Sequence, residues 1–195
     1  MYLSYQNGKI NGYTEEPQDL VLYNLDKVEE TTDKYVLDGE QYVKLDEEYY
    51  TLKAPEYKKE LINNIYQIKA DKAYGGVTIN DTLVFETNQT SITNTVASLA
   101  LMSDTATANW KFYTINGEPI FQQVTKLQLA GIAQFGREMM DEAFKVEGEA
   151  NTALSTATVE QLNNKEWRNN FITEIQTEMD KVNNKLTVEF GQSEV

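Results

Sequence analysis

The 195-residue sequence contains no cysteine and no histidine. Without cysteine, the chain has no disulfide, no thiolate nucleophile and no cysteine-based zinc site. Without histidine, it lacks the usual general base, the Ser-His-Asp triad and the commonest metal ligand. Catalysis would have to use carboxylates, serine with lysine, tyrosine or a hard metal ion. These two absences favour a protein that is not an enzyme.

Basic residues and long apolar runs are also scarce. Lysine and arginine total 17 against 31 acids, which gives a net charge of −14. No cluster of basic residues is available to follow a phosphate backbone. The longest apolar run, Val96–Met102, is far shorter than the ~20 residues of a membrane helix, and Met1–Asn7 lacks the basic and apolar regions of a signal peptide. We therefore expect no nucleic-acid partner and no membrane insertion.

Residues 1–54 predict a small, tyrosine-rich antiparallel β module. Nine of the twelve tyrosines lie at or before Tyr57, and residues 1–56 carry 13 acids and 5 lysines, a net charge of −8. Tyrosine, valine and threonine fit a half-buried pleated surface, and Pro55 is predicted to end the module. The expected strands are Leu20–Tyr23, Tyr35–Leu37, Tyr42–Leu45 and Tyr49–Leu52, with a turn at Asp38-Gly39.

Residues 55–150 predict a central α+β domain of helices with two β-hairpins. A helical spacing of apolar residues starts near Lys58 and stops at Gly75-Gly76. A second helix is expected after a cap at Asn88 or Thr90, and a third after the capping box of Thr125 and Gln128. The two hairpins are predicted at Val77–Thr87, around Asn80-Asp81, and at Trp110–Val124, around Asn116-Gly117.

Residues 151–195 predict a C-terminal amphipathic helix and tail. A capping box of Thr158 and Gln161 precedes apolar residues that recur every three or four positions. A single apolar stripe on a polar helix needs a partner surface, so we predict a protein–protein interface at this stripe. Alternate tyrosines of the N-terminal module fill or flank its β core, and we expect two of them to lie in an interface. The tail Thr187–Phe190 is predicted to add a strand to a neighbouring molecule. The predicted interface residues are Trp167, Phe171, Ile175, Met179, Val182, Leu186, Tyr49 and Tyr50.

No catalytic, cofactor-binding or metal-binding residue is predicted. Asp46-Glu47-Glu48 offers hard oxygen ligands but lacks the Asp-x-Asp-x-Asp-Gly spacing of a calcium loop, which favours a solvated turn. No spacing among the 31 acids singles out the carboxylate pair of a glycosidase. Trp110 is interpreted as a core residue of its hairpin.

An ordered set of short motifs covers about residues 58–150. It begins with Lys69-Ala70-Asp71-Lys72 before Gly75-Gly76-Val77-Thr78 and continues with Phe85-Glu86-Thr87-Asn88, Trp110-Lys111, Asn116-Gly117 and the Leu/Ala-rich helix after Val124. This set resembles a domain of unknown function that recurs in bacteriophage tail-fibre and other tail-associated proteins. Each piece is common, and the specificity of the resemblance comes from their order.

The resemblance brings no catalytic residues, but it implies a structural component of a phage tail fibre, adaptor or baseplate. Such a protein is made in the host cytoplasm and assembles in the virion with other tail proteins and with copies of itself. Two alternatives remain open. One is a tail-fibre assembly chaperone that leaves before the virion matures, and the other is a receptor-recognition module that binds a host surface glycan through exposed Tyr and Trp.

Overall fold

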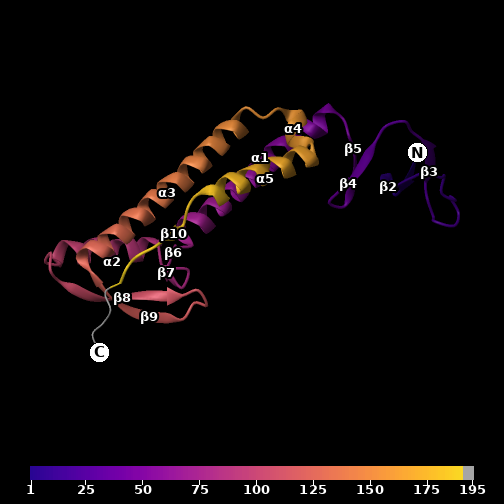
Figure 1. The fold of residues 1–195 in the computed structure, drawn as a ribbon. Helices are drawn as coiled ribbons and strands as arrows, with labels where there is room; N and C mark the ends of the chain where they lie inside the picture. The colour runs from indigo at the N-terminus through magenta and orange to yellow at the C-terminus, as the bar shows by residue number, and fades with distance from the viewer. Residues whose placement is uncertain (191–195) are drawn as a thin grey trace. The chain divides into compact units, whose positions relative to one another are not determined.

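The computed structural model describes residues 1–190, which form five helices and ten short strands (Figure 1). The chain divides into two compact units. The first contains residues 1–59 and 158–164, and the second contains residues 60–157 and those from Lys165 onward. The predicted α+β class is confirmed, with small antiparallel sheets at the N-terminus and a helical central region.

The first unit contains two separate antiparallel sheets. Strands β1 (Tyr2–Gln6), β2 (Lys9–Thr14) and β3 (Lys27–Glu30) form a three-stranded sheet in the order β2-β1-β3. Strands β4 (Tyr35–Asp38) and β5 (Gln41–Lys44) form the second sheet. Gly39 lies between β4 and β5 with φ +64°, a conformation that glycine adopts without strain. The hairpin predicted at Asp38-Gly39 is therefore confirmed.

Two of the predicted N-terminal strands are wrong. Leu20–Tyr23 forms a turn, because the Asp19 Oδ1 accepts hydrogen bonds from the backbone N–H groups of Val21 (2.9 Å) and Leu22 (2.8 Å). Tyr49–Leu52 is helical, because the Asp46 Oδ1 accepts the Tyr49 N–H at 3.0 Å and acidic residues fill the first helical turn. In both segments a short aspartate side chain bonds to nearby backbone, which overrides the alternating apolar pattern.

The break expected at Pro55 is also wrong, because Pro55 lies inside helix α1 (Glu47–Tyr74). A proline removes one helical hydrogen bond, but here its ring is exposed while Ala54, Leu61 and Ile65 are buried. Burial of these apolar side chains opposes the local cost of the proline. The boundary between the two compact units falls within α1, between Lys59 and Glu60.

The second unit contains a five-stranded sheet in the order β10-β6-β7-β8-β9. Its strands are β6 (Val77–Ile79), β7 (Leu83–Phe85), β8 (Thr107–Thr114), β9 (Pro119–Thr125) and β10 (Lys185–Leu186). Both predicted hairpins are confirmed. Strand β8 pairs with β9 along nearly its whole length but with β7 only at Tyr113 and Thr114. Strand β7 is only three residues long, so the first part of β8 extends past the end of β7.

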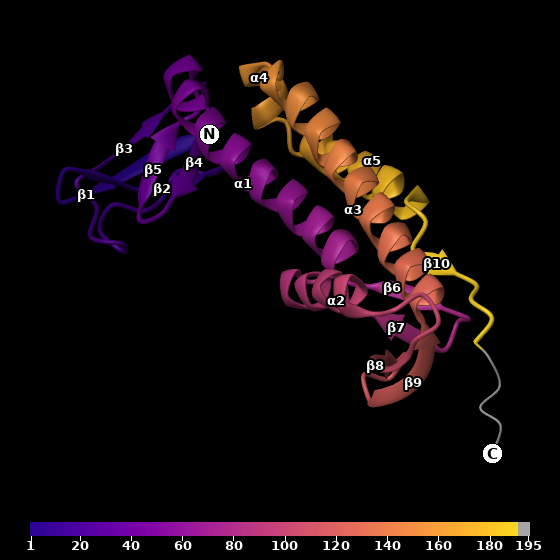
Figure 2. The ribbon, with the colours of Figure 1, turned by 90° about the vertical axis from the view of Figure 1, so that its left-hand side faces the viewer.

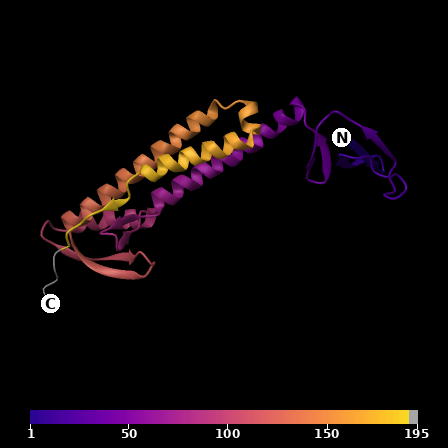
Figure 3. The same ribbon diagram turned by 45° about the vertical axis from the view of Figure 1, so that its right-hand side comes forward.

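The predicted caps start the helices of the second unit. Helix α2 (Gln89–Leu101) is capped by Asn88, and α3 (Lys126–Ser155) by the capping box of Thr125 and Gln128. Helix α3 contacts α2 and α5 (Lys165–Lys181). Figures 2 and 3 show α3 and α5 running alongside each other. The capping box of Thr158 and Gln161 opens only the short α4 (Val159–Asn163), in the first unit.

The tail after α5 packs on the second unit itself, so the strand predicted to pair with a neighbouring molecule is corrected. Leu186 lies in β10, which pairs in parallel with β6. The Asn80 side chain accepts the Val188 N–H at 2.9 Å and donates to the Val188 carbonyl at 2.8 Å. The Phe190 ring lies 6.0 Å from that of Phe112. Residues 191–195 of the predicted C-terminal segment lie outside the described residues.

Candidate functional site

The predicted apolar stripe packs mainly into the chain's own core. Ile175, Met179 and Val182 are only 6%, 1% and 5% exposed, and Met179 and Val182 belong to the main core cluster. Leu186 is not on the helix at all, because it pairs in β10. The stripe does need a partner surface, as the sequence indicates, but the second unit supplies that surface. These four residues are therefore corrected from an intermolecular interface to the core and sheet of this unit.

The other predicted interface residues keep part of their surface exposed. Trp167 and Phe171 are half-buried at the start of α5, with stacked rings 5.1 Å apart. Tyr49 and Tyr50 lie in the first turn of α1, with ring centroids 5.7 Å apart. Burial raises the pKa of Tyr49, while Tyr50 is exposed. Their assignment as an interface stays a prediction.

An ordered turn in the first unit exposes four consecutive apolar residues, Leu20–Tyr23. Val21 is 91% exposed and Leu22 is 73% exposed. The turn is held from both ends, because the Leu25 N–H donates to the Leu20 carbonyl at 2.9 Å in addition to the two bonds to Asp19. We call this segment the apolar turn. Apolar side chains held out in water in this way are typical of a protein-binding surface.

The acidic run Asp46-Glu47-Glu48 opens α1 instead of forming a solvated turn or a cation loop. Within residues 1–190, no group of three acidic side chains lies close enough together to hold a metal ion. None of the helices in this part of the chain combines the length and the apolar character that crossing a membrane requires.

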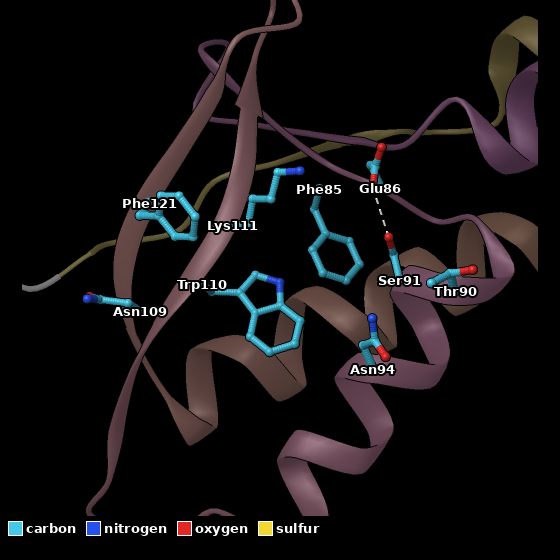
Figure 4. A pocket seen from close by; sticks show the side chains of 9 residues that line it. All are labelled: Phe85, Glu86, Thr90, Ser91, Asn94, Asn109, Trp110, Lys111 and Phe121. Carbon is cyan, nitrogen blue, oxygen red and sulfur yellow. Dashed lines mark hydrogen bonds between the residues drawn. The ribbon is translucent and has the colours of Figure 1, made fainter.

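A cavity in the second unit lies where β8 extends past the end of β7, facing the start of α2 (Figure 4). Its volume is about 410 Å³. The half-buried Trp110 ring extends from β8 toward α2, and Phe85 lies beside it. Phe121, on β9, is 66% exposed. We call this cavity the Trp110 pocket; its remaining lining residues are Glu86, Thr90, Ser91, Asn94, Asn109 and Lys111.

The polar side of the Trp110 pocket carries one acidic and one basic side chain. The Ser91 hydroxyl donates to Glu86 Oε2 at 2.9 Å, which holds this carboxylate beside the helix (Figure 4). Lys111 donates to the Tyr113 hydroxyl, and this bond raises the pKa of Lys111. Lys111 therefore stays protonated at neutral pH, and its charge offsets that of Glu86.

Sequence reasoning missed this pocket because its lining comes from three segments. Glu86 and Asn94 flank the start of α2, whereas Trp110 lies on β8, after the helix has ended. Trp110 does pack partly against the core, as predicted, but it also lines the cavity. The turn at Asn116-Gly117 predicts the second hairpin, and the cap at Asn88 predicts the start of α2. Neither feature specifies how far β8 runs beside β7.

Comparison with known proteins gives no match: no protein-family model fits the chain, and neither the curated proteins nor the solved structures include a significantly similar one.

Proposed function

We propose that this chain is a structural component of a bacteriophage tail that acts by protein–protein assembly. The observation that carries the proposal is the order of motifs in residues 58–150, which resembles the domain of tail-associated proteins. The helix, hairpin, helix, hairpin and helix formed by these residues follow one another along the chain. Such a protein belongs to the virion, at the tail fibre, an adaptor or the baseplate.

The apolar turn is the proposed attachment point to another tail protein. Its exposed side chains would be buried in the assembled tail, which gives a favourable free energy in proportion to the area covered. Acidic residues flank it on both sides, at Glu15, Glu16, Asp19 and Asp26. The partner surface should therefore be apolar at its centre and basic at its rim.

The tail location is tested by mass spectrometry of purified phage particles. The proposal expects the chain in mature particles at a fixed ratio to other tail proteins. An assembly chaperone would be present in infected cells and absent from the particles, so that result would overturn the structural role and favour the alternative.

The attachment point is tested with a matched pair of substitutions in the first unit. Leu22→Glu adds a charge to the apolar turn, and Leu52→Glu adds the same charge to α1 at a similarly exposed position, 73% against 67%. We expect Leu22→Glu to reduce incorporation into particles by about tenfold or more, because burying an unpaired carboxylate is costly. Equal incorporation of both variants would show that the turn does not attach the protein.

A further inference from the structure

We propose that the Trp110 pocket binds a neutral saccharide of one or two sugar rings. The pocket has about 410 Å³ of space, within the range of about 300–1,000 Å³ that is usual for small-molecule sites. This inference concerns the isolated chain, and it holds whether or not the chain is part of a virion.

The aromatic side chains supply the apolar part of the site. Trp110 extends its indole ring toward α2, and the Phe85 ring lies beside it (Figure 4). One face of a hexose ring carries mainly C–H groups, which pack on an aromatic face. The hydroxyls at the sugar's edge stay free for hydrogen bonds. Aromatic rings of this kind combine a large contact area with little loss of side-chain freedom.

The polar side chains match the hydroxyls of a sugar. The Asn94 amide offers both donors and acceptors, and the Glu86 carboxylate offers acceptors only. A sugar hydroxyl donates one hydrogen bond and accepts others, so it can satisfy both kinds of group. Ser91 fixes one Glu86 oxygen through its hydroxyl and leaves the second oxygen for a ligand.

The charges favour a neutral ligand over a charged one. Glu86 repels phosphates and carboxylates, and so does the net charge of −14. Lys111 repels ammonium and guanidinium groups at the same site. Because the two charges offset each other, the pocket favours the binding of an uncharged ligand that has many hydrogen-bonding groups.

The pocket is preformed by regular elements on two sides. Trp110 and Lys111 lie on β8, which is paired with β9 at both positions, and Asn94 lies on α2, which is capped by Asn88. A ligand therefore meets side chains that are already ordered, and little conformational entropy is lost on binding.

The fluorescence of Trp110 provides a direct readout. The chain has two tryptophans, so the Trp167→Phe variant leaves Trp110 as the only one and keeps an aromatic ring on Phe171. The probes are methyl glycosides of glucose, galactose, mannose, rhamnose, N-acetylglucosamine and N-acetylgalactosamine, together with maltose and lactose. Inorganic phosphate and lysine methyl ester serve as charged probes. We expect at least one sugar to change the Trp110 emission saturably at millimolar concentration, and neither charged probe to do so.

Substitutions then assign the binding to the pocket, with saturation-transfer NMR on the sugar as the readout. Asn94→Ala should weaken binding about fivefold, and Glu86→Gln about tenfold because a charged acceptor is lost while the residue keeps its shape. Asn151→Ala is the control, since Asn151 is an exposed asparagine on α3 outside the pocket. Circular dichroism checks that each variant is folded.

Three results would overturn the proposal. One is that no sugar of the panel binds up to 50 mM, roughly the weakest affinity that such a pocket would give. Another is that a charged probe binds while the sugars do not. The third is that Asn94→Ala and Glu86→Gln bind as well as Asn151→Ala, which would place the binding elsewhere on the chain.

Discussion

The Lys69 ammonium lies 3.4 Å from the Glu147 Oε2, linking α1 to α3 within the second unit. The lysine side chain is only 4% exposed and that of the glutamate 19%. Aromatic rings surround the ammonium, with centroids 4.4 Å away for Tyr66 and Phe144 and 5.8 Å away for Tyr74. A lysine is rarely buried unless its charge is paired, and ring faces add further attraction. This cluster therefore fixes how α1 and α3 meet.

Removing the carboxylate should destabilise the second unit. Glu147→Gln leaves a buried ammonium without its ion-pair partner, and we expect the free energy of unfolding to fall by about 3 kcal/mol. The double variant Lys69→Met/Glu147→Gln should recover to within about 1 kcal/mol of the wild type, because methionine fills similar space without a charge. Urea unfolding followed by tryptophan fluorescence measures both. If the double variant is no more stable than Glu147→Gln, the pairing is not what holds this cluster together.

Local signals in the sequence predicted much of the second unit. Asn88 caps α2 and Thr125 opens α3 as expected, because a cap bonds to backbone only three residues away. The turns of both hairpins are equally local, and Asn80 and Gly117 adopt the positive φ that their residue types tolerate. These features need no information about distant parts of the chain.

The sequence-based predictions are wrong where side-chain bonds to the backbone, or contacts with distant parts of the chain, determine the structure. Leu20–Tyr23 has the composition of a strand, but its backbone bonds to Asp19. The spacing on α5 predicts an apolar stripe, yet nothing in that spacing says that its partner is the core of the same chain. The Trp110 pocket depends on how far β8 extends past the end of β7, which is set by the pairing of the whole sheet. The periodicity of a sequence describes one helix or strand at a time, so it does not show which elements contact one another.

Gly76 should be among the most sensitive glycines. It has φ +95°, and a Cβ there would lie 2.7 Å from Val84 Cγ1 and 2.8 Å from the Phe85 carbonyl oxygen. Gly117 has a similar φ of +84° but has open space around the added carbon, so Gly117→Ala is the matched control. We expect Gly117→Ala to cost about 1 kcal/mol of stability for its backbone conformation, and Gly76→Ala about 3 kcal/mol because the clash adds to that cost. Thermal and urea unfolding of the two variants gives the comparison; equal losses would mean that the sheet relaxes around Gly76.

The stability of the first unit should fall at high pH because of Tyr5. Its hydroxyl donates to the Glu29 carboxylate, and this bond raises the pKa of Tyr5 from 10.0 to about 12. The folded state thus holds the proton more tightly than the unfolded state. The stabilisation is fully present below pH 10 and is lost as the pH rises toward about 12. Unfolding measured between pH 9 and pH 12 should show this loss in the wild type and a smaller loss in Tyr5→Phe.

The Glu29→Gln variant separates the carboxylate from other causes of this pH dependence. It keeps an oxygen that can accept from Tyr5 but removes the negative charge, so the pKa of Tyr5 should move back toward 10. Nuclear magnetic resonance of ¹³C-labelled tyrosine follows the ring directly. A Tyr5 titration that is the same in the wild type and in Glu29→Gln would contradict the assignment to this hydrogen bond.

The two ends of α5 should respond differently to truncation. Met179 is 1% exposed in the main core, whereas Phe171 is half-buried against Trp167. We expect Met179→Ala to lower the free energy of unfolding by about 3 kcal/mol, because it opens a cavity in packed surroundings, and Phe171→Ala to lower it by about half as much.

Sedimentation should give the same mass for Met179→Ala as for the wild type under native conditions, since this side chain faces the chain's own core. If Met179→Ala instead changed the assembly state at unchanged stability, the stripe would be the intermolecular surface that its spacing suggests, and the packing of α5 on α3 would have to be abandoned.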